Sequence, residues 1–343
     1  DWTTKMQLDY TTQKFVYYFD DLERRALPSG GGNTYNLPPS INAASMIQAF
    51  SADDQNVAYV CGNRIWQTKN LMNPNPVWTE IMPTASSIKS LAVVKNHPNI
   101  LAYSANTRIY ISYNALSASP TFVNYTFPVA VTASSIAISS VDTNLIFVVL
   151  NNKVYKSVNG GVTFTDYTGS LPNISQKTLF LDDYSTDQSL YVGNALGVYY
   201  RNNSLADWVN YSGVLPTIAS IRDIMYFNDG GMDAKMYVSY FGRGTWQTKL
   251  ENNHNCAAPV ISSANWTGNQ LLVNWNNTAA ASYDIQYRET GTLNWITNAA
   301  NTNNATLNAM SGCNQFELRV RGRCGSDSSL WSTRVFVNSP TNA

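Results

Sequence analysis

The chain has no surplus of charge, because 22 basic side chains balance 22 acidic ones among its 343 residues. This balance argues against a binding surface for nucleic acids or anionic membranes, which needs an excess of Lys and Arg. No run of 18 apolar residues occurs, so no membrane-spanning helix is predicted. Charged residues make up only 13% of the chain, whereas Asn, Ser, Thr and Tyr are abundant. Such a composition is typical of an all-β surface with many turns.

Residues that usually carry chemistry are also scarce. The two histidines are His97, in a predicted turn, and His254, in a predicted linker. Neither has metal-ligand spacing to a cysteine or to the other histidine. The chain has no Gly-x-Ser-x-Gly motif and no phosphate-binding glycine loop followed by Lys, and Asp229-Gly-Gly-Met-Asp233 lacks the register of a calcium loop. We therefore expect no cofactor, no metal and no catalytic residues.

Cysteine is rare in the first three-quarters of the chain and clustered afterwards. Cys61 stands alone and is expected to be a small core residue. Cys256, Cys313 and Cys324 all lie after the repeats, within a small predicted β domain. This clustering favours a disulfide and an oxidising compartment, and free buried thiols are the alternative. No signal peptide is visible, and Asp1 falls inside a repeat-like stretch, so we expect that further chain precedes it.

What the sequence does contain is a repeat of about 44 residues through its first three-quarters. A proline ends each unit, a large aromatic residue precedes the proline, and a second aromatic residue lies in the middle of the unit. The prolines are Pro38, Pro83, Pro128, Pro172 and Pro216; the preceding aromatics are Tyr35, Trp78, Phe122, Phe164 and Trp208; the middle aromatics are Trp66, Tyr110, Tyr155, Tyr199 and Trp246. A period in this range with strand-like content indicates a propeller or another repeat array.

One unit, residues 134–172, shows the strands most clearly. Ser135–Ser139 alternates between apolar and polar residues, and Leu145–Leu150 is a continuous apolar run. Asn151-Asn152 is a two-residue hairpin turn, after which Lys153–Ser157 alternates again. A fourth short strand is expected near Phe164. Four strands joined by tight turns form one antiparallel propeller blade, and the neighbouring units follow the same template.

The last unit predicts an incomplete blade. Its strands are Ile221–Phe227, Lys235–Ser239 and Gly244–Leu250. The segment Asp1–Lys5 resembles the fourth-strand pieces Val77–Glu80 and Asp207–Asn210. We expect Trp2 to supply the missing strand and to close a ring of six blades, because an open ring leaves strand edges unpaired. The alternative is that earlier blades precede this sequence, which would give seven or more.

Two motifs resemble known propeller families. Ser157-x-Asn-x-Gly-x-Thr-Phe164 resembles the Asp-box of bacterial neuraminidase-type (BNR) repeats, with Asn159 where aspartate is usual. Tyr240-Phe-Gly-Arg-Gly-Thr-Trp246 resembles the closing Gly-Arg-Gly-Val-Trp of sortilin-like and xyloglucanase-like propellers. The resemblance covers about residues 1–250 and implies a β-propeller. It also implies that Ser157, Asn159, Gly161 and Phe164 form a structural turn.

Residues 251–255 form a polar linker, and residues 256–343 predict a second domain. About seven short strands in about 85 residues are typical of an immunoglobulin-like sandwich. Trp275, Tyr283–Arg288, Phe316–Arg321 and Ser329-x-Trp-Ser332 resemble a fibronectin type III domain, in particular the modules of secreted proteins from Bacteroidota. The resemblance implies export across an outer membrane, as a client of type IX secretion.

The same resemblance implies a disulfide between Cys256 and Cys324, with Cys313 at the opposite pole of the sandwich. Closing a loop of that length stabilises a fold by roughly 4 kcal/mol in the entropic model.

The best interpretation of the sequence is a secreted or cell-surface binding or adhesion protein with a propeller recognition face. The candidate ligand-binding residues on one rim are Arg64, Arg108, Tyr240 and Arg243, because exposed aromatics and arginines concentrate binding energy. Their alternative role is that of ordinary hairpin residues. The expected partner is a protein or glycan at the cell surface, or the export machinery, with no nucleic acid and no membrane span.

A glycoside hydrolase with a propeller core and an accessory module is the alternative function. Such an enzyme needs two carboxylates facing one sugar. The candidate pairs are Asp20-Asp21, Asp53-Asp54 and Asp182-Asp183, and all three fit turns at blade edges better. A third possibility is a structural stalk segment of a larger polypeptide.

Overall fold

The fold is described from a computed structural model. It describes residues 6–8, 15–18, 23–26, 32–34, 36–38, 41, 47–51, 54, 56–82, 88–95, 97–182, 185, 187–213, 215–216, 219–227, 235–251, 258–278, 280–290, 292, 295–308, 314–324, 327–329, 331–332 and 334–340. Every regular element in these ranges is a β-strand. Within them, no helix is long and apolar enough to cross a membrane. The all-β class predicted from the sequence is therefore confirmed.

The chain divides into two compact units. The first comprises Asp1–Asp183, Asp187–Phe227 and Met236–Thr248. The second comprises Lys249–Ala343 together with the short segments Tyr184–Thr186 and Asn228–Lys235. Each unit is described below by itself.

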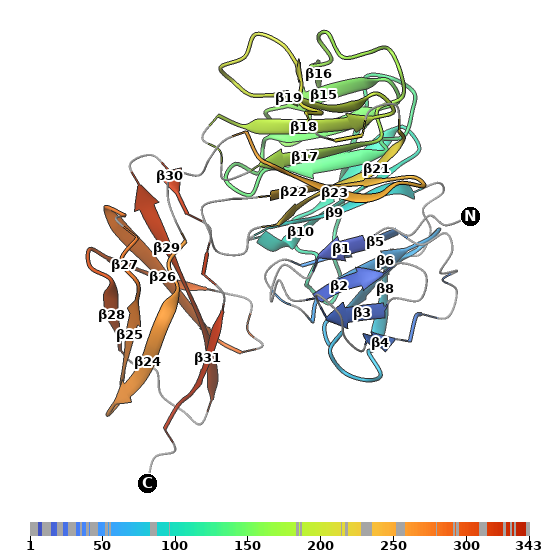
Figure 1. Cartoon of the computed structure of the whole chain (residues 1–343). Coiled ribbons are helices and arrows are strands. Elements are labelled where there is room, and N and C mark those ends of the chain that lie inside the picture. Colours follow the sequence, from blue (N-terminus) through green and yellow to red (C-terminus); the bar gives the residue numbers. More distant parts are fainter. Residues whose placement is uncertain are drawn as a thin grey trace. The chain divides into compact units, whose positions relative to one another are not determined.

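Six antiparallel sheets, here called blades 1 to 6, follow one another along the first unit (Figure 1). Each consists of strands that are consecutive in sequence and joined by hairpins. Blade 1 contains β1 (Met6–Leu8), β2 (Phe15–Tyr18), β3 (Glu23–Ala26) and β4 (Gly32–Thr34); blade 2 contains β5 (Ile47–Phe50), β6 (Ala58–Cys61), β7 (Ile65–Thr68) and β8 (Trp78–Met82); blade 3 contains β9 (Ile88–Val94), β10 (His97–Ala105), β11 (Arg108–Ser112) and β12 (Val123–Thr126). Blade 4 contains β13 (Ser135–Ile138), β14 (Ile146–Leu150), β15 (Lys153–Ser157) and β16 (Thr165–Asp166); blade 5 contains β17 (Thr178–Asp182), β18 (Ser189–Asn194), β19 (Gly197–Arg201) and β20 (Val209–Asn210); blade 6 contains β21 (Ile221–Phe227), β22 (Lys235–Tyr240) and β23 (Gly244–Lys249).

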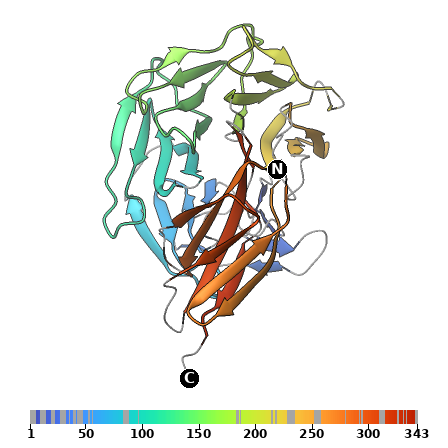
Figure 2. The ribbon, with the colours of Figure 1, turned by 90° about the vertical axis from the view of Figure 1, so that its left-hand side faces the viewer.

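The first strands of the blades lie beside one another. β9 contacts both β5 and β13, β17 contacts both β13 and β21, and β21 also contacts β1. The last blade therefore meets the first, and Figure 2 shows the sheets of this unit following a ring. Blade 6 has three strands in the part of the chain that is described. Asp1–Lys5, which we expected to complete it, lies outside the described residues.

Aromatic side chains fill the blades with the period of the repeat. Tyr59, Tyr103, Phe147 and Tyr191 occupy the second strands of blades 2 to 5, are at most 1% exposed, and follow one another at intervals of 44 residues. Tyr103 stacks on Tyr110 of the neighbouring strand, with ring centres 4.7 Å apart. Apolar residues of adjacent blades merge into shared cores, one between blades 3 and 4 and another between blades 4 and 5. Each fully buried Val, Leu or Ile contributes about 1.5–3 kcal/mol, so the blade interfaces hold the unit together.

The second unit contains two sheets around one core. The three-stranded sheet consists of β24 (Ile261–Thr267), β25 (Gln270–Trp275) and β28 (Asn304–Leu307). The five-stranded sheet consists of β27 (Ile296–Ala300), β26 (Ser282–Glu289), β29 (Gln315–Cys324), β30 (Asp327–Ser328) and β31 (Val335–Asn338). Residues of both sheets share the core: Leu271, Val273, Trp275 and Leu307 from the first, and Tyr283, Ile285, Phe316, Leu318 and Val320 from the second.

The cysteines of the second unit bear on the expected disulfide. Cys324, at the end of β29, is disulfide-bonded. Cys256 and Cys313 lie outside the described residues, so the pairing of Cys256 with Cys324 stays a prediction. Cys61, in β6, is a buried thiol, as expected for a small core residue.

Candidate binding face

The candidate residues Arg64, Arg108 and Arg243 share one end of the ring. Strands of a blade alternate in direction, so the turns between second and third strands lie at the same end as the starts of the first strands. We call this end the turn face. It contains the turns after β6, β10, β14, β18 and β22, and the starts of β9, β17 and β21. Arg64 and Arg243 lie in two of these turns, and Arg108 begins β11 directly after a third.

Two of the candidate arginines hold a neighbouring strand of their own blade. In blades 2, 3 and 4, the basic residue at the start of the third strand donates a hydrogen bond to the fourth strand. The pairs are Arg64 Nη1 with both carboxylate oxygens of Glu80 (2.9 and 2.7 Å), Arg108 Nη1 with Asn124 Oδ1 (2.8 Å) and Lys153 Nζ with Asp166 Oδ2 (2.7 Å). These contacts explain Arg64 and Arg108 as residues that fix the ends of hairpins, and they also hold the remaining guanidinium N–H groups in place.

The pair in blade 4 shifts both pKa values. Burial alone would raise the pKa of Asp166, but hydrogen bonds from Lys153 and Thr168 outweigh it and lower that pKa to about 2. The hydrogen bond to Asp166 raises the pKa of Lys153. The two side chains are 45% and 44% exposed. Water and salt therefore screen the attraction, and the pair orients the turn more than it stabilises it.

Tyr240 does not have the exposure that we expected of a rim residue. It ends β22 and is only 5% exposed. Burial raises its pKa to about 12, and its hydroxyl is buried without a hydrogen-bond partner among the described residues. The expectation of an exposed tyrosine is therefore wrong, because the side chain belongs to the packed interior of the unit.

The exposed aromatic side chain of this turn is Phe241, which sequence reasoning missed. It is 51% exposed, and the guanidinium of Arg222 lies 4.8 Å from its ring centre. Arg243, two residues later, is exposed, and its carbonyl oxygen accepts a hydrogen bond of 3.0 Å from Trp246 Nε1. Leu196, in the turn of blade 5, is 41% exposed. A large apolar residue inside a short turn is the signal that could have identified both Phe241 and Leu196.

The Ser157 motif forms a tight turn at the opposite end of blade 4. Ser157 Oγ donates to Asn159 Oδ1 (2.9 Å) and accepts from the Gly161 amide (2.9 Å), while the Thr163 amide donates to Asn159 Oδ1 (3.0 Å). Gly161 has a φ of 91°, which a residue with a Cβ rarely adopts. Phe164 packs against Phe127 of blade 3, with ring centres 5.7 Å apart.

The same turn recurs in two blades where we did not predict it. Thr68 and Asn70 in blade 2, and Ser112 and Asn114 in blade 3, repeat the hydroxyl-to-Asn hydrogen bond at 2.9 and 3.1 Å. The Asn Oδ1 then accepts a backbone N–H from the start of the next segment at 2.8 and 2.9 Å. The sequence signal for this turn is an Asn that follows, by two residues, the Ser or Thr at the end of the third strand. All three motifs are structural turns.

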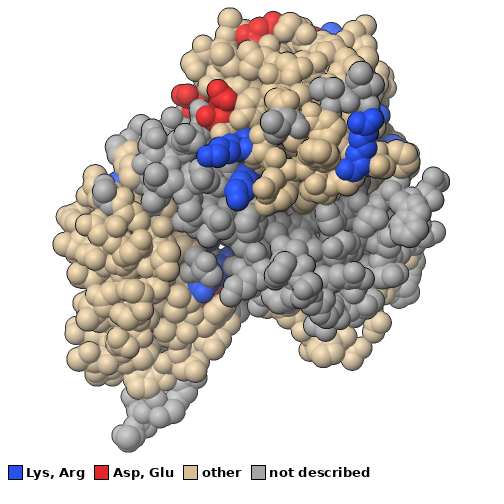
Figure 3. Space-filling model, viewed as in Figure 1, with Lys and Arg blue, Asp and Glu red and all other residues tan. Residues whose placement is uncertain are grey.

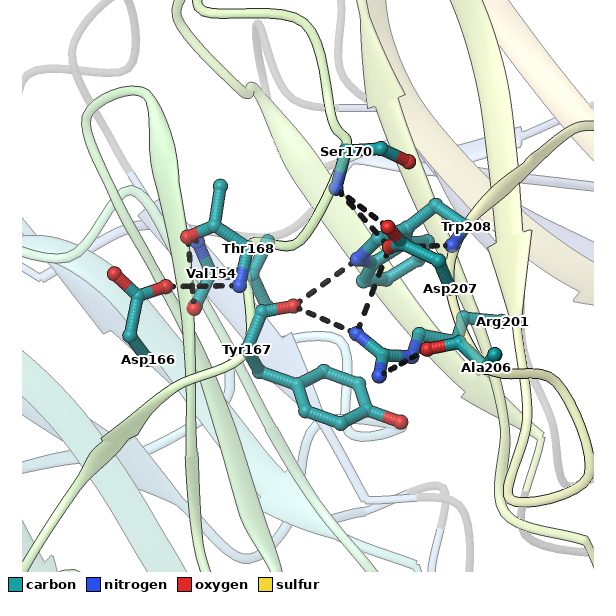
Figure 4. A network of polar contacts seen from close by, with 9 residues as sticks. All are labelled: Val154, Asp166, Tyr167, Thr168, Ser170, Arg201, Ala206, Asp207 and Trp208. Carbon is teal, nitrogen blue, oxygen red and sulfur yellow. Dashed lines mark hydrogen bonds and ion pairs between the residues drawn. The ribbon is translucent and has the colours of Figure 1, made fainter.

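A network between blades 4 and 5 explains the aromatic residue near the start of the fourth strand (Figure 4). Trp208 Nε1 and Arg201 Nη1 of blade 5 donate to the Tyr167 carbonyl of blade 4, at 3.0 and 3.3 Å. The Arg201 guanidinium also lies 4.0 Å from the Tyr167 ring centre. Hydrogen bonds from the backbone N–H groups of Ser170 and Trp208 lower the pKa of Asp207. Trp78 repeats the pattern, because its Nε1 donates to the Asn36 carbonyl at 2.7 Å.

The carboxylates considered for hydrolysis are described only in part. Asp54 caps a turn, with its Oδ1 accepting the Asn56 amide at 2.9 Å. Asp182 ends β17 and is 1% exposed. Asp20, Asp21, Asp53 and Asp183 lie outside the described residues. Among the residues that are described, no three His, Cys, Asp or Glu side chains gather to hold a metal ion.

No protein-family model and no curated protein sequence matches the chain. Among solved structures, it is similar to a chain of the "Mitotic Checkpoint Complex", with 10% identity and a TM-score of 0.50 over 74% of this chain and 76% of that one. It is also similar to the GH74 enzyme of Niastella koreensis (17% identity, TM-score 0.41, covering 68% of this chain and 34% of that one). A third structure, titled "Myokine structure", has 16% identity and a TM-score of 0.23 over 24% of this chain and 97% of that one.

These likenesses bear on the fold alone. The first supports a β-propeller, in agreement with the succession of small antiparallel sheets. The chain spans about a third of the length of the GH74 enzyme, and the TM-scores of the second and third matches are too low to carry an argument.

Proposed function

We propose that the protein is a secreted or cell-surface binding protein that recognises its partner with the turn face of its propeller. The observation that carries the proposal is the exposed combination of Phe241, Arg222 and Arg243 in blade 6. A half-exposed aromatic ring held by one guanidinium and flanked by another is the composition of residues that dominate binding interfaces. No ion pair joins Arg222 or Arg243 to a described residue, so both cations remain available.

Internal contacts support the finer family assignments as proposals. The three Ser/Thr-x-Asn turns fit an Asn-containing variant of the Asp-box, as in sortilin-like and neuraminidase-type propellers. In the second unit, Ser329 Oγ and Ser332 Oγ accept the backbone N–H groups of Gly322 and Val320, at 2.8 and 3.0 Å. These bonds fasten the Ser329-x-Trp-Ser332 segment to β29. We propose on this basis a fibronectin type III module that serves as a spacer or a second contact surface.

The binding proposal is tested with the full chain on arrays of surface glycans and cell-surface proteins. The variant Phe241→Ser/Arg243→Ser should lose most of the signal, since it removes the ring together with an exposed cation. The matched control is Val141→Ser, because Val141 is 80% exposed at the opposite end of the ring. Loss of signal in the control instead would contradict the assignment to the turn face. Release of new reducing ends from a bound glycan would contradict a pure binding role in favour of a hydrolase.

Export is a separate proposal with its own test. The disulfide at Cys324 supports an oxidising compartment, because disulfides persist outside the reducing cytosol. We propose that the full-length protein is a type IX secretion client. Expressed in a Bacteroidota host, it should reach the cell surface or the medium, and it should be retained when the type IX machinery is inactivated. The same distribution with and without that machinery would contradict the proposal.

A further inference from the structure

We propose that the turn face binds a linear acidic polysaccharide. The inference rests on the proposed function, since it assumes that this face is the recognition surface, and it adds the chemical class of the ligand.

Charge is distributed unequally between the two ends of the ring. Across blades 2 to 6, the described residues of the turn face include seven basic side chains against three acidic ones, an excess of four. The basic residues are Arg64, Lys89, Arg108, Lys153, Lys177, Arg222 and Arg243, and the acidic ones are Glu80, Asp166 and Asp223. The zero net charge of the whole chain gives no sign of this excess. A locally positive face attracts anions even when the whole molecule is neutral. In the view of Figure 3, small groups of basic side chains are visible on both sides of the first unit, and one group of acidic side chains lies beside a basic group.

The cations that remain available are spread over several blades. Glu80 and Asp166 neutralise Arg64 and Lys153. Lys89, Lys177, Arg222 and Arg243 are exposed, and none of the four forms an ion pair with a described residue. They belong to or directly precede strands of blades 3, 5 and 6. An extended ligand with repeated negative charges can engage several of them at once, whereas a single small anion cannot.

The turns add groups that suit hydroxyl-rich ligands. Asn63, Asn106 and Asn151 are exposed and occupy equivalent turns in blades 2, 3 and 4. Asn106 and Asn151 have φ values of 52° and 58°, a conformation that Asn tolerates better than most residues. Each amide offers both donors and acceptors. An Asn side chain therefore lies next to a basic residue in several successive blades. This repeat is complementary to a polymer in which hydroxyl and acid groups alternate.

The small number of exposed apolar residues at this end favours a glycan over a protein partner. The large apolar side chains exposed in the described turns of this face are Leu196 and Phe241. The opposite end exposes more of them: Val77, Tyr113, Val123, Val141, Val158, Val162 and Val209. Protein interfaces centre on apolar and aromatic anchors. The turn face instead offers cations and amides, with a single exposed aromatic ring among the described residues of these turns on which a sugar ring can stack.

Binding of the full chain to polygalacturonate, with its fully methyl-esterified form as the neutral counterpart, tests the inference. The two polymers share one sugar backbone and differ in their carboxyl groups, which are charged in the first and neutral methyl esters in the second. Wild type should bind polygalacturonate, should not bind the ester, and should bind more weakly as salt rises. Lys177→Ser/Arg243→Ser should weaken binding about tenfold or more, since each cation near a polyanion contributes appreciably. Lys177→Arg/Arg243→Lys should restore it, because that variant keeps both charges.

The control variant is Lys95→Ser/Lys249→Ser, which removes two cations from the opposite end of the blades and should leave binding unchanged. Equal binding to both polymers, or equal loss in the control, would overturn the inference. So would tighter binding to single-stranded DNA at matched charge, which would point to a general polyanion surface. If the wild type does not bind polygalacturonate but gives an array signal that depends on Phe241 and Arg243, the ligand is not an acidic polysaccharide, and the proposed function is still supported. If neither signal appears, both fail.

Discussion

The guanidinium of Arg319 lies 4.1 Å from the centre of the Trp295 ring, on the outer face of the five-stranded sheet. It also lies 4.7 Å from the centre of Trp331, whose ring is in turn 4.6 Å from Arg321. Cation–π contacts of this kind occur about once per 70–80 residues. Their concentration here converts an outer sheet face into a packed layer, in which arginines are buried among tryptophan rings.

Glu317 supplies the negative charge that this layer needs. Its carboxylate pairs with Arg288 at 2.7 Å and with Arg334 at 3.1 Å, and all three side chains are at most 8% exposed. Glu317→Gln should destabilise the second unit by about 3–5 kcal/mol, because it removes the charge of a carboxylate that pairs with two buried cations. Arg323→Ser is the control, since Arg323 is 47% exposed and its pair with Asp284 should be worth about 0–1 kcal/mol. Denaturant unfolding followed by limited proteolysis of the second unit measures both. Equal effects of the two changes would contradict the burial argument.

The indole hydrogen bond of Trp208 should make a measurable contribution to the interface between blades 4 and 5. Trp208→Phe keeps a large apolar ring near Leu171 and Leu179 but cannot donate to the Tyr167 carbonyl. The loss should cost about 1 kcal/mol, plus a smaller packing term. Trp246→Phe is the matched control, because Trp246 is 45% exposed and its indole N–H donates to the Arg243 carbonyl of its own blade. If the two variants unfolded at the same denaturant concentration, the interblade hydrogen bond would have no special role.

The sequence predicted the repeat well because its signals are local. Strand alternation, two-residue turns and the Trp or Phe near the fourth strand depend on neighbours within a blade, and the structure has hairpins where residues 134–172 predicted them. The series Tyr59, Tyr103, Phe147 and Tyr191, spaced by 44 residues, was not predicted. Each of these residues lies in a continuous apolar strand, and only its burial in the structure distinguishes it.

The candidate site was harder to predict, for a physical reason. Whether Tyr240 or Phe241 faces solvent depends on where β22 ends, and a one-residue shift exchanges the two sides of a strand. Lys89, Lys177 and Arg222 lie far apart in the sequence, and only the closing of the ring gathers them on one face. The pairing of Arg64 with Glu80 likewise needs the register of β7 and β8, which no composition reveals.

Removing Asp1–Lys5 should lower the stability of the first unit. Trp78 and Trp208 both donate an indole N–H to the preceding blade, and we predict the same for Trp2 in completing blade 6. Loss of a strand partner for β23 should reduce the melting temperature by several degrees, since 1 kcal/mol corresponds to about 2–4 °C for a unit of this size. Trp2→Ala should give part of the effect, and Thr3→Ser almost none. An unchanged melting temperature after the deletion would contradict the assignment of Asp1–Lys5 to blade 6.

Alkaline pH should destabilise the first unit at pH values below those at which the buried tyrosines of the folded protein ionise. Burial raises the pKa of Tyr240 to about 12, and it also raises those of Tyr59 and Tyr103. Raised folded-state pKa values mean that stability is intact below the unfolded value near 10 and falls as pH rises from there towards 12. Tyr240→Phe should flatten this fall without lowering stability at neutral pH, because the hydroxyl of Tyr240 bonds to none of the residues that the structure describes. Unfolding curves at increasing pH, with tyrosinate absorbance recorded in parallel, provide the measurement. A steeper fall in Tyr240→Phe would contradict the assignment.

The partner of Cys324 is predicted to be Cys256. β29 is ten residues long and ends at Cys324, so it spans about 30 Å at 3.3 Å per residue. Cys313 precedes the other end of this strand by two residues, whereas a disulfide joins Cα atoms at most about 7 Å apart. Non-reducing peptide mapping should therefore recover a peptide pair containing Cys256 and Cys324. Cys256→Ser should lower the stability of the second unit by roughly 4 kcal/mol, and Cys313→Ser should leave it nearly unchanged. Recovery of a Cys313–Cys324 pair would require that β29 break within its length, and would overturn the strand register that places Glu317, Arg319 and Arg321 on one face.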